Sequence, residues 1–235
     1  MRATTVGSGL TVVTEHMPGV RSLALGFWVG TGSVDEAPAL SGASHFLEHL
    51  LFKGTETRTA RSIADAIDGV GGDMNAFTTK EYTAFYVRLL ADDTDLALDI
   101  LDDIIWSPAF RSDELELERQ VILEEILMRA DEPADLVHEL FAAARFPAHP
   151  LGRDVLGDES SVRQMTRDGI AAFHAAHYRP GNLVVAAAGE VDHERITRGI
   201  RDRMPAWADG AARAAPVRQP PGAPPEQTAL AERPT

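Results

Sequence analysis

The sequence predicts an α+β fold, in which a mostly antiparallel sheet carries helices packed on one face. Short runs of β-branched and aromatic residues come in neighbouring pairs, which favours antiparallel pairing of consecutive strands. Amphipathic helical segments separate these pairs, and a chain with 44% hydrophobic residues can bury a large core. Together these patterns predict one domain built from a sheet and a layer of helices.

The first two expected strands are joined by a short turn. A β-branched run at 10–16 ends at Pro18 and Gly19, and a second apolar run follows at 20–30. Because so short a connection usually joins strands that pair with each other, we expect these two to form an antiparallel hairpin.

The helical pattern begins at 40–51, where Ser41 or Ser44 is the expected cap and Gly54 provides a stop. The other elements expected in chain order are a helix at 59–72, two strands around a turn near Lys80, helices at 93–108, 112–129 and 133–145, two helical pieces within 160–182, a buried strand at 182–191 and a last helix at 192–204 capped by Asp192.

The composition changes after Pro205. Seven of the 14 prolines fall within 205–235. Proline-rich stretches of this kind form extended spacers and not packed cores. We therefore expect a domain at 1–204 and a linker or tail at 205–235.

Charge and cysteine content exclude several classes of protein. The net charge is -14, from 22 basic and 36 acidic residues, which argues against nucleic acid or an anionic membrane as a partner. The absence of cysteine excludes disulfides and Cys-rich structural zinc sites. The first residues lack a signal-peptide pattern, and the longest apolar run, 183–189, is too short to span a bilayer. A cytoplasmic protein is expected.

The stretch "SHFLEHLLFKGT" places His45, Glu48 and His49 within an apolar helical run. Residues four apart share a helix face, so His45 and His49 can direct two imidazoles at one zinc ion. Glu48 reaches the edge of that face, where it is poorly placed as a ligand but well placed to accept a proton from a water on the metal. Two incidental histidines on an amphipathic helix are the alternative, and a metal site still requires a third ligand.

The helix at 112–129 offers that third ligand. At 100° per residue, Glu118 and Glu125 fall among apolar residues, where a carboxylate is costly unless a cation compensates its charge. Glu124 falls on the polar side and is the competing ligand, but the helical phase favours Glu125. Arg129 is expected to help compensate the second acid. Two histidines and one carboxylate leave a fourth position open, as in catalytic zinc sites.

Other motifs carry less weight. His174 and His177 have no acidic companion and precede Pro180, so we expect them to be structural residues at a helix C-terminus. The glycine-rich stretches lack the residues of phosphate-binding loops, and no serine stands in a G-x-S-x-G turn.

H-x-x-E-H is the signature of the inverzincins, and the chain resembles the N-terminal half of the M16 metallopeptidases, the pitrilysin, insulinase and mitochondrial processing peptidase group. The resemblance covers about 10–204 and rests on "GFWVGTGSVDE", "GASHFLEHLLFKGT", "GGDMNAFTTKEYTAFY", "ERQVILEEI" and "YRPGNLVVAAAGEVD". It implies a LuxS-like domain and a zinc metalloendopeptidase with one Zn²⁺ per chain. The implied roles are zinc ligation by His45, His49 and Glu125, general base catalysis by Glu48, and support of catalysis by Glu118.

The same resemblance implies that the strand "NAFTTKEY" is an open sheet edge that binds a peptide substrate as an added strand, through Asn75, Ala76 and Phe77. Structural roles in a turn and the core are an equal alternative for these three residues. Family members pair domains of this kind, so a second M16-type domain or subunit, or self-association, is the expected partner. The alternative to an enzyme is a non-catalytic or truncated subunit that needs a second domain for activity.

Overall fold

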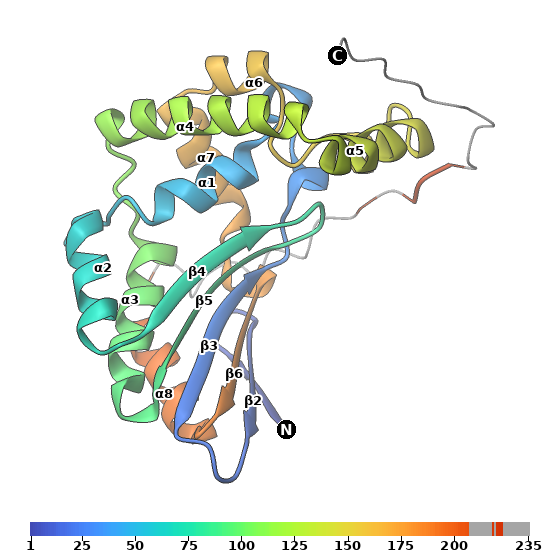
Figure 1. Ribbon diagram of the computed structural model, residues 1–235. Helices are drawn as coiled ribbons and strands as arrows, with labels where there is room; N and C mark the ends of the chain where they lie inside the picture. Colours follow the sequence, from blue (N-terminus) through green and yellow to red (C-terminus); the bar gives the residue numbers. More distant parts are fainter. Residues whose placement is uncertain (207–217, 219, 223–235) are drawn as a thin grey trace.

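The computed structural model describes residues 1–206, 218 and 220–222. It contains a six-stranded sheet with the order β1-β2-β6-β3-β5-β4 (Figure 1). The strands are β1 (Arg2–Val6), β2 (Leu10–His16), β3 (Ser22–Val29), β4 (Asp73–Thr78), β5 (Thr83–Leu90) and β6 (Leu183–Gly189). The helices are α1 (Ala43–Leu51), α2 (Ala60–Gly69), α3 (Thr94–Trp106), α4 (Ser112–Asp131), α5 (Pro133–Arg145), α6 (Glu159–Gln164), α7 (Arg167–His177) and α8 (His193–Arg203).

The sheet is mostly antiparallel, as the sequence predicts. Only β2 and β6 run parallel, and the other four pairs of neighbours are antiparallel. The pair β4 and β5 forms the expected hairpin around Lys80, with Phe77 opposite Ala84. Strands β1 and β4 are the two edges of the sheet.

The predicted hairpin of β2 and β3 is wrong. Strand β6 lies between them, parallel to β2 and antiparallel to β3, so that Val184 faces Thr11 on one side and Trp28 on the other. Strand β2 instead pairs with β1, which the sequence analysis did not predict. A turn signal reports only that the chain reverses, whereas a strand from much later in the chain can insert between the two arms.

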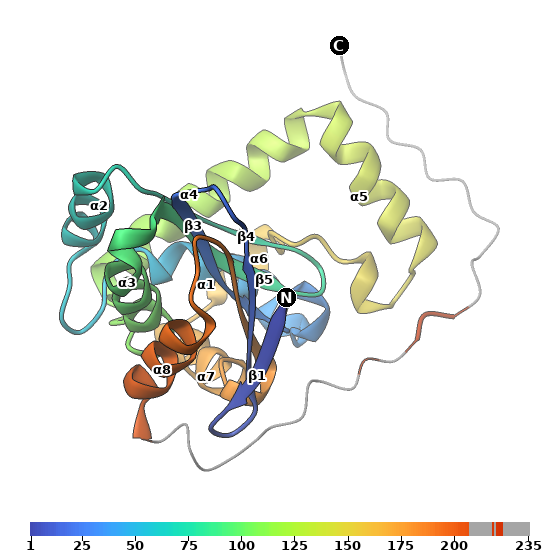
Figure 2. The same ribbon diagram turned by 90° about the horizontal axis from the view of Figure 1, so that it is seen from below.

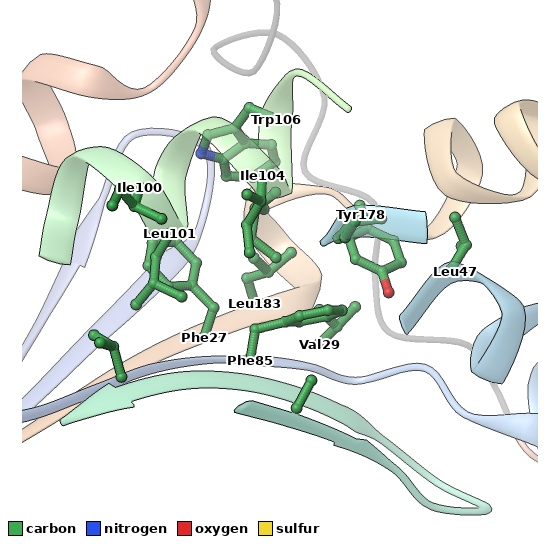
Figure 3. Close-up of a cluster of buried hydrophobic side chains, with 14 of the residues drawn as sticks. Phe27, Val29, Leu47, Phe85, Ile100, Leu101, Ile104, Trp106, Tyr178 and Leu183 are labelled. Atoms are coloured by element: carbon green, nitrogen blue, oxygen red, sulfur yellow. The ribbon is translucent and has the colours of Figure 1, made fainter. Parts of the chain in front are cut away.

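All the large helices that face the sheet cover the same side of it. The views in Figures 1 and 2 show α2, α3 and α8 together on one side of the strands. Side chains alternate along β3, where Leu23, Leu25, Phe27 and Val29 are buried under the helices. Figure 3 shows this core, in which Phe27 and Phe85 of the sheet meet Ile104 of α3. The predicted fold class is therefore confirmed.

The opposite face of the sheet is open. Residues that alternate with the core residues, among them Trp28, Tyr86 and Val184, are only partly buried, and Val184 is 39% exposed. Strand β6 is thus buried on one face only, although its unbroken apolar run predicted burial on both. A shallow depression of about 410 Å³ on this face is lined mostly by apolar and aromatic residues, among them Trp28, Phe77 and Tyr86, with Glu15 and Arg88 also in its lining.

Helix α1 does not begin as the sequence suggested. Its N-terminal cap is Gly42, with φ +91°, and neither Ser41 nor Ser44 caps it. The carboxylate of Glu36 accepts hydrogen bonds from the backbone N–H groups of Gly42 (2.8 Å) and Ser44 (2.7 Å). Glu36 is 4% exposed, and burial raises the pKa of its carboxyl to about 7. The side chain of Glu36, from a preceding turn, therefore caps the free N–H groups at the start of α1 in place of a local serine.

The last helix, α8, ends at Arg203 and is capped by Asp192, as expected. Most of the proline-rich stretch predicted as a linker or tail, 205–235, lies outside the described residues. Arg218 is described, and its guanidinium forms a salt bridge with Asp35 (2.7 Å). Within the described ranges, no helix has the length and apolar character that crossing a bilayer requires.

Candidate metal centre

Two imidazoles and one carboxylate converge where α1 packs against α4 (Figure 1). The Nε2 atoms of His45 and His49 lie 3.6 and 3.7 Å from Oε2 of Glu125. One ligand atom from each of the three residues lies within 4.8 Å of the other two. Residues four apart on α1 share a face, and Glu125 meets that face from the neighbouring helix.

These donor atoms fit a zinc ion. Nitrogen and oxygen ligands about 2.0–2.1 Å from a tetrahedral zinc lie about 3.3 Å from one another. The two separations of 3.6 and 3.7 Å are close to that value. Glu124, the competing ligand, is exposed on α4 and lies outside the group. The geometry therefore brings together the three residues that helical phase selected.

His45 is held as a neutral imidazole. Its side chain is 13% exposed, and burial, with smaller contributions from His49 and Arg129, lowers its pKa to about 3. A neutral imidazole keeps the lone pair that a metal needs. Its Nδ1 is buried and has no hydrogen-bond partner among the described residues.

His49 is oriented by a second carboxylate. Its Nδ1 lies 2.9 Å from Oε2 of Glu118, which is 5% exposed, and Lys53 Nζ lies 2.8 Å from Oε1 of the same carboxylate. A carboxylate on Nδ1 fixes the tautomer that leaves Nε2 free for a metal. The expected role of Arg129 is wrong, because its guanidinium bonds to Asp154 (2.9 Å) and Lys53 compensates Glu118 instead.

Glu48 lies beside the three candidate ligands, and one of its carboxylate oxygens accepts a hydrogen bond. The hydroxyl of Thr78, the last residue of β4, donates a hydrogen bond of 2.6 Å to its Oε2. Burial raises the pKa of the Glu48 carboxyl, while the bond from Thr78 and the nearby His49 act to lower it. A carboxylate with a raised pKa beside a candidate metal site suits proton transfer near neutral pH.

Asn75, Ala76 and Phe77 lie on the edge strand β4 and not in a turn. Asn75 Oδ1 accepts the backbone N–H of Ala76 at 2.8 Å, so this N–H points away from β5. In an antiparallel pair the backbone groups of alternate residues point to opposite sides. The outward groups of Met74, Ala76 and Thr78 therefore lie on the free edge of the sheet, where the side chain of Asn75 occupies the N–H of Ala76.

An open cleft borders the candidate ligands His45 and Glu125. Its volume is about 520 Å³, and it is lined by His45, Glu125, Met128, Arg129, Glu132, Asp135 and Leu156. The side chain of Glu125 is 37% exposed, and Met128 is 70% exposed, so the α4 sector that the sequence suggested was apolar and buried is open here. Solvent can reach the candidate ligand atoms from this side.

The second histidine pair is structural, as predicted, but for a different reason. His174 is 7% exposed, its Nε2 bonds the carbonyl of Ile105 (2.9 Å), and burial lowers its pKa to about 4. A neutral His174 cannot complement the helix dipole as a cation would. His177 Nδ1 lies 3.2 Å from the hydroxyl of Thr31.

Sequence reasoning missed Glu36, Lys53 and Thr78, each of which contacts the site or the helix that carries it. Lys53 is four residues after His49, a helical spacing that offered a local clue to its place beside the site. Thr78 and Glu36 had no such clue, because their contacts join segments that only the fold brings together.

Comparisons with known proteins agree with this geometry. A sequence model of the family described as Insulinase (Peptidase family M16) matches residues 11–159. These residues include all three candidate ligands and Glu48. A second model, described as Peptidase M16 inactive domain, matches residues 164–233, which contain none of them.

Curated relatives extend the likeness. The chain is 51% identical over 201 residues to an uncharacterised zinc protease of Mycobacterium leprae, covering 86% of this chain and 45% of the relative. It is also 51% identical to an uncharacterised zinc protease of Streptomyces coelicolor, covering 86% and 44%. The chain thus spans about half the length of the curated relatives it matches.

Solved structures share the fold. A protease from Helicobacter pylori superposes with a TM-score of 0.87 at 25% identity, over 93% of this chain and 53% of that one. A peptidase M16 inactive domain from Pseudomonas fluorescens gives 0.86 at 21% identity, over 95% and 54%, a likeness of fold alone.

Proposed function

Because this chain belongs to the insulinase family of peptidases, M16, we propose that it is the zinc-binding catalytic portion of a metalloendopeptidase. The observation that carries the proposal is the convergence of His45, His49 and Glu125 within 4.8 Å beside the carboxylate of Glu48. The names of the curated relatives, zinc proteases, support the same reaction class.

Each residue of the site has a separate role in the proposed reaction. His45, His49 and Glu125 would hold one Zn²⁺, and Glu118 would keep His49 in the tautomer that exposes Nε2. When bound, zinc would polarise a peptide carbonyl and lower the pKa of a coordinated water to about 7. Glu48 would accept the proton of the attacking water at its carboxylate and then deliver that proton to the leaving amine.

The proposed peptide substrate binds by pairing with the edge strand β4. An extended peptide that pairs with the outward carbonyls of Ala76 and Thr78, and displaces Asn75 Oδ1 from the N–H of Ala76, would be held beside Glu48, whose carboxylate bonds to Thr78. Main-chain pairing recognises an unfolded segment with little regard to its sequence. The proposed substrates are therefore peptides or unstructured polypeptide segments, with Asn75, Ala76 and Phe77 as the binding strand.

A second M16-type domain or subunit is the proposed partner, with self-association as the alternative. The open sheet face, with Trp28, Tyr86 and the 39%-exposed Val184, is the apolar surface that such a partner would cover. The curated relatives are about twice as long as the matched region, which leaves room for a second domain. A cytoplasmic location, the domain at 1–204 and the linker at 205–235 remain part of this proposal.

The test is cleavage of a quenched unstructured peptide. The chain is assayed alone and together with the unmatched half of the Streptomyces coelicolor relative, with and without a chelator. We expect chelator-sensitive cleavage, and we expect Glu48→Gln to retain zinc but lose at least a hundredfold in rate, since general base catalysis contributes about 10²–10⁴-fold.

Two outcomes would contradict the proposal. Unchanged turnover by Glu48→Gln would exclude its role as base. No cleavage by a zinc-loaded complex of the two halves would favour the non-catalytic subunit.

A further inference from the structure

The hydroxyl of Thr78 has one proton, and three acceptors lie around it. Glu48 Oε2 is 2.6 Å away, whereas Thr83 Oγ1 and the carbonyl of Ser44 are 3.4 and 3.5 Å away. Hydrogen bonds to an ionised carboxylate are short and about twice as strong as neutral ones. Thr83 gives its own hydroxyl proton to the carbonyl of Thr31 at 3.0 Å. The proton of Thr78 therefore goes to Glu48.

This bond leaves the two oxygens of Glu48 in different states. Oε2 is held by Thr78, and Oε1 remains to accept a proton from water. A carboxylate held at one oxygen keeps the rotation that aims the other, whereas a free carboxylate samples several rotamers.

Thr78 also belongs to the strand that would bind peptide. It is the last residue of β4, and its backbone groups share the outward side with those of Ala76, as argued above. The hydroxyl and the backbone N–H of Thr78 both interact with the Glu48 carboxylate, and its carbonyl remains on the outward side of the strand. A single hydrogen bond from the Thr78 side chain thus links the proposed peptide-binding edge of the sheet to the proposed base, Glu48.

We infer that Thr78 is a positioning residue, whose hydroxyl aims Glu48 at the attacking water and ties it to the peptide-binding edge of the sheet. The inference rests on the proposed peptidase function, since it assigns Thr78 a part in that reaction.

The test compares Thr78→Val, which keeps the shape but loses the hydroxyl, with Thr78→Ser, which keeps the hydroxyl. In the assembled two-half complex, Thr78→Val should lower kcat by tenfold or more, an order expected for a misplaced catalytic group. KM and the zinc content should stay unchanged, and Thr78→Ser should recover most of the rate. Thr197→Val on α8, a buried threonine whose hydroxyl has no hydrogen-bond partner among the described residues, is the matched control and should retain full activity.

A second measurement does not depend on activity. In the metal-free chain, Thr78→Val should shift the unfolding equilibrium constant by about tenfold, as expected for loss of a hydrogen bond to a charged group. The same substitution in a Glu48→Met background should shift it by much less, because the partner is gone. Equal shifts in the two backgrounds would overturn the inference.

The kinetic outcomes separate the two claims. An active unsubstituted chain with an unchanged kcat in Thr78→Val would overturn the positioning role and leave the peptidase proposal standing. A fall in kcat that Thr78→Ser does not restore would also overturn it, because the hydroxyl would not be responsible. No cleavage by the unsubstituted complex would overturn the peptidase proposal, and the positioning role with it.

Discussion

At the scale of single residues, the two imidazoles of α1 are prepared for a metal in different ways. His45 is made neutral by burial, which lowers its pKa to about 3. His49 is oriented by Glu118, whose charge is balanced by Lys53 at 2.8 Å. Removal of one ligand should therefore leave the other still able to bind, but with too few donors to hold zinc tightly.

We predict that His49→Ala loses zinc, because only His45 and Glu125 remain as donors. Metal analysis of the purified variant should find well under one zinc per chain. Glu124→Gln, a change at the exposed neighbour of Glu125, is the control and should bind zinc normally. Full retention of zinc by His49→Ala would exclude the assignment.

Glu118→Gln should weaken zinc binding without abolishing it. The amide still reaches Nδ1 of His49 but carries no charge, and loss of such a supporting carboxylate typically costs 10–100-fold in metal affinity. Competition with a zinc-sensitive dye measures the shift. Glu116→Gln, on the exposed side of the same helix, is the matched control, and an equal loss of affinity in both variants would contradict the role of Glu118.

Sequence alone predicted the residues whose relation is local. His45 and His49 are one turn apart, and Glu118 and Glu125 are two turns apart, so helical geometry fixes their common faces. It could not place Thr78 or Glu36, whose partners Glu48 and Ser44 lie 30 and 8 residues away in a different element. Nor could it show that Lys53 rather than Arg129 faces Glu118, since both are flexible cations at plausible positions.

At the scale of elements, the N-terminus of α1 is fixed by tight contacts rather than by a capping hydroxyl. Gly42 has φ +91°, and a Cβ there would stand 2.4 Å from the carbonyl oxygen of Leu156. The chain before α6 therefore presses directly on the start of the helix that carries both histidines.

Gly42→Ala should destabilise the fold by about 2 kcal/mol or more, since both the backbone conformation and the contact with Leu156 oppose a side chain. Gly69→Ala is the control, because Gly69 lies in α2 with nothing within 4 Å of an added Cβ. That control should gain about 0.5–1 kcal/mol. Urea unfolding of the metal-free chain measures both, and a neutral Gly42→Ala would contradict the packing described.

Helix α3 carries a buried acid that should make stability depend on pH. Asp102 is 7% exposed and accepts a hydrogen bond from the Trp106 indole at 2.9 Å. Burial raises its pKa from 3.8 to about 7, against the weaker opposing effects of Trp106 and Arg203. The folded state thus keeps a proton that the unfolded chain releases above pH 3.8.

The stabilisation linked to Asp102 is complete below pH 3.8 and is lost as the pH rises through about 7. Relative to Asp102→Asn, the free energy of unfolding should fall by up to about 1.4 kcal/mol per pH unit across this window and level off above it. Urea unfolding from pH 4.5 to 8.5 tests the slope. Asp68→Asn makes the same chemical change at an exposed position, and parallel curves for the chain and Asp102→Asn would contradict the prediction.

At the scale of the whole molecule, the sequence predicted the layers but not the order of the strands. Neighbouring strand runs and amphipathic helical segments correctly indicated a sheet with helices on one face, although the unbroken apolar run of β6 predicted burial on both faces of that strand. The insertion of β6 between β2 and β3 joins segments separated by more than 150 residues. No local pattern encodes such a pairing, because it is selected by the packing of the finished sheet.

The open face of that sheet leads to a last prediction, about assembly. Val184, the second residue of β6, lies on this face between Thr11 and Trp28 and is 39% exposed. If a second M16-type domain covers this face, a carboxylate at Val184 would be buried without a partner, at a cost of several kcal/mol. Val184→Glu should therefore weaken binding to the unmatched half of the Streptomyces coelicolor relative by a hundredfold or more.

Leu117→Glu is the matched control, because Leu117 is 63% exposed on α4 and lies away from the sheet. It adds the same charge and should leave the affinity unchanged. Calorimetry measures binding, and light scattering after size exclusion reports whether the chain associates with itself in the absence of the other half. Thermal unfolding of both variants confirms that each remains folded. Equal affinities for Val184→Glu and the unsubstituted chain would place the partner elsewhere, since burial of an unpaired carboxylate in an apolar interface costs free energy.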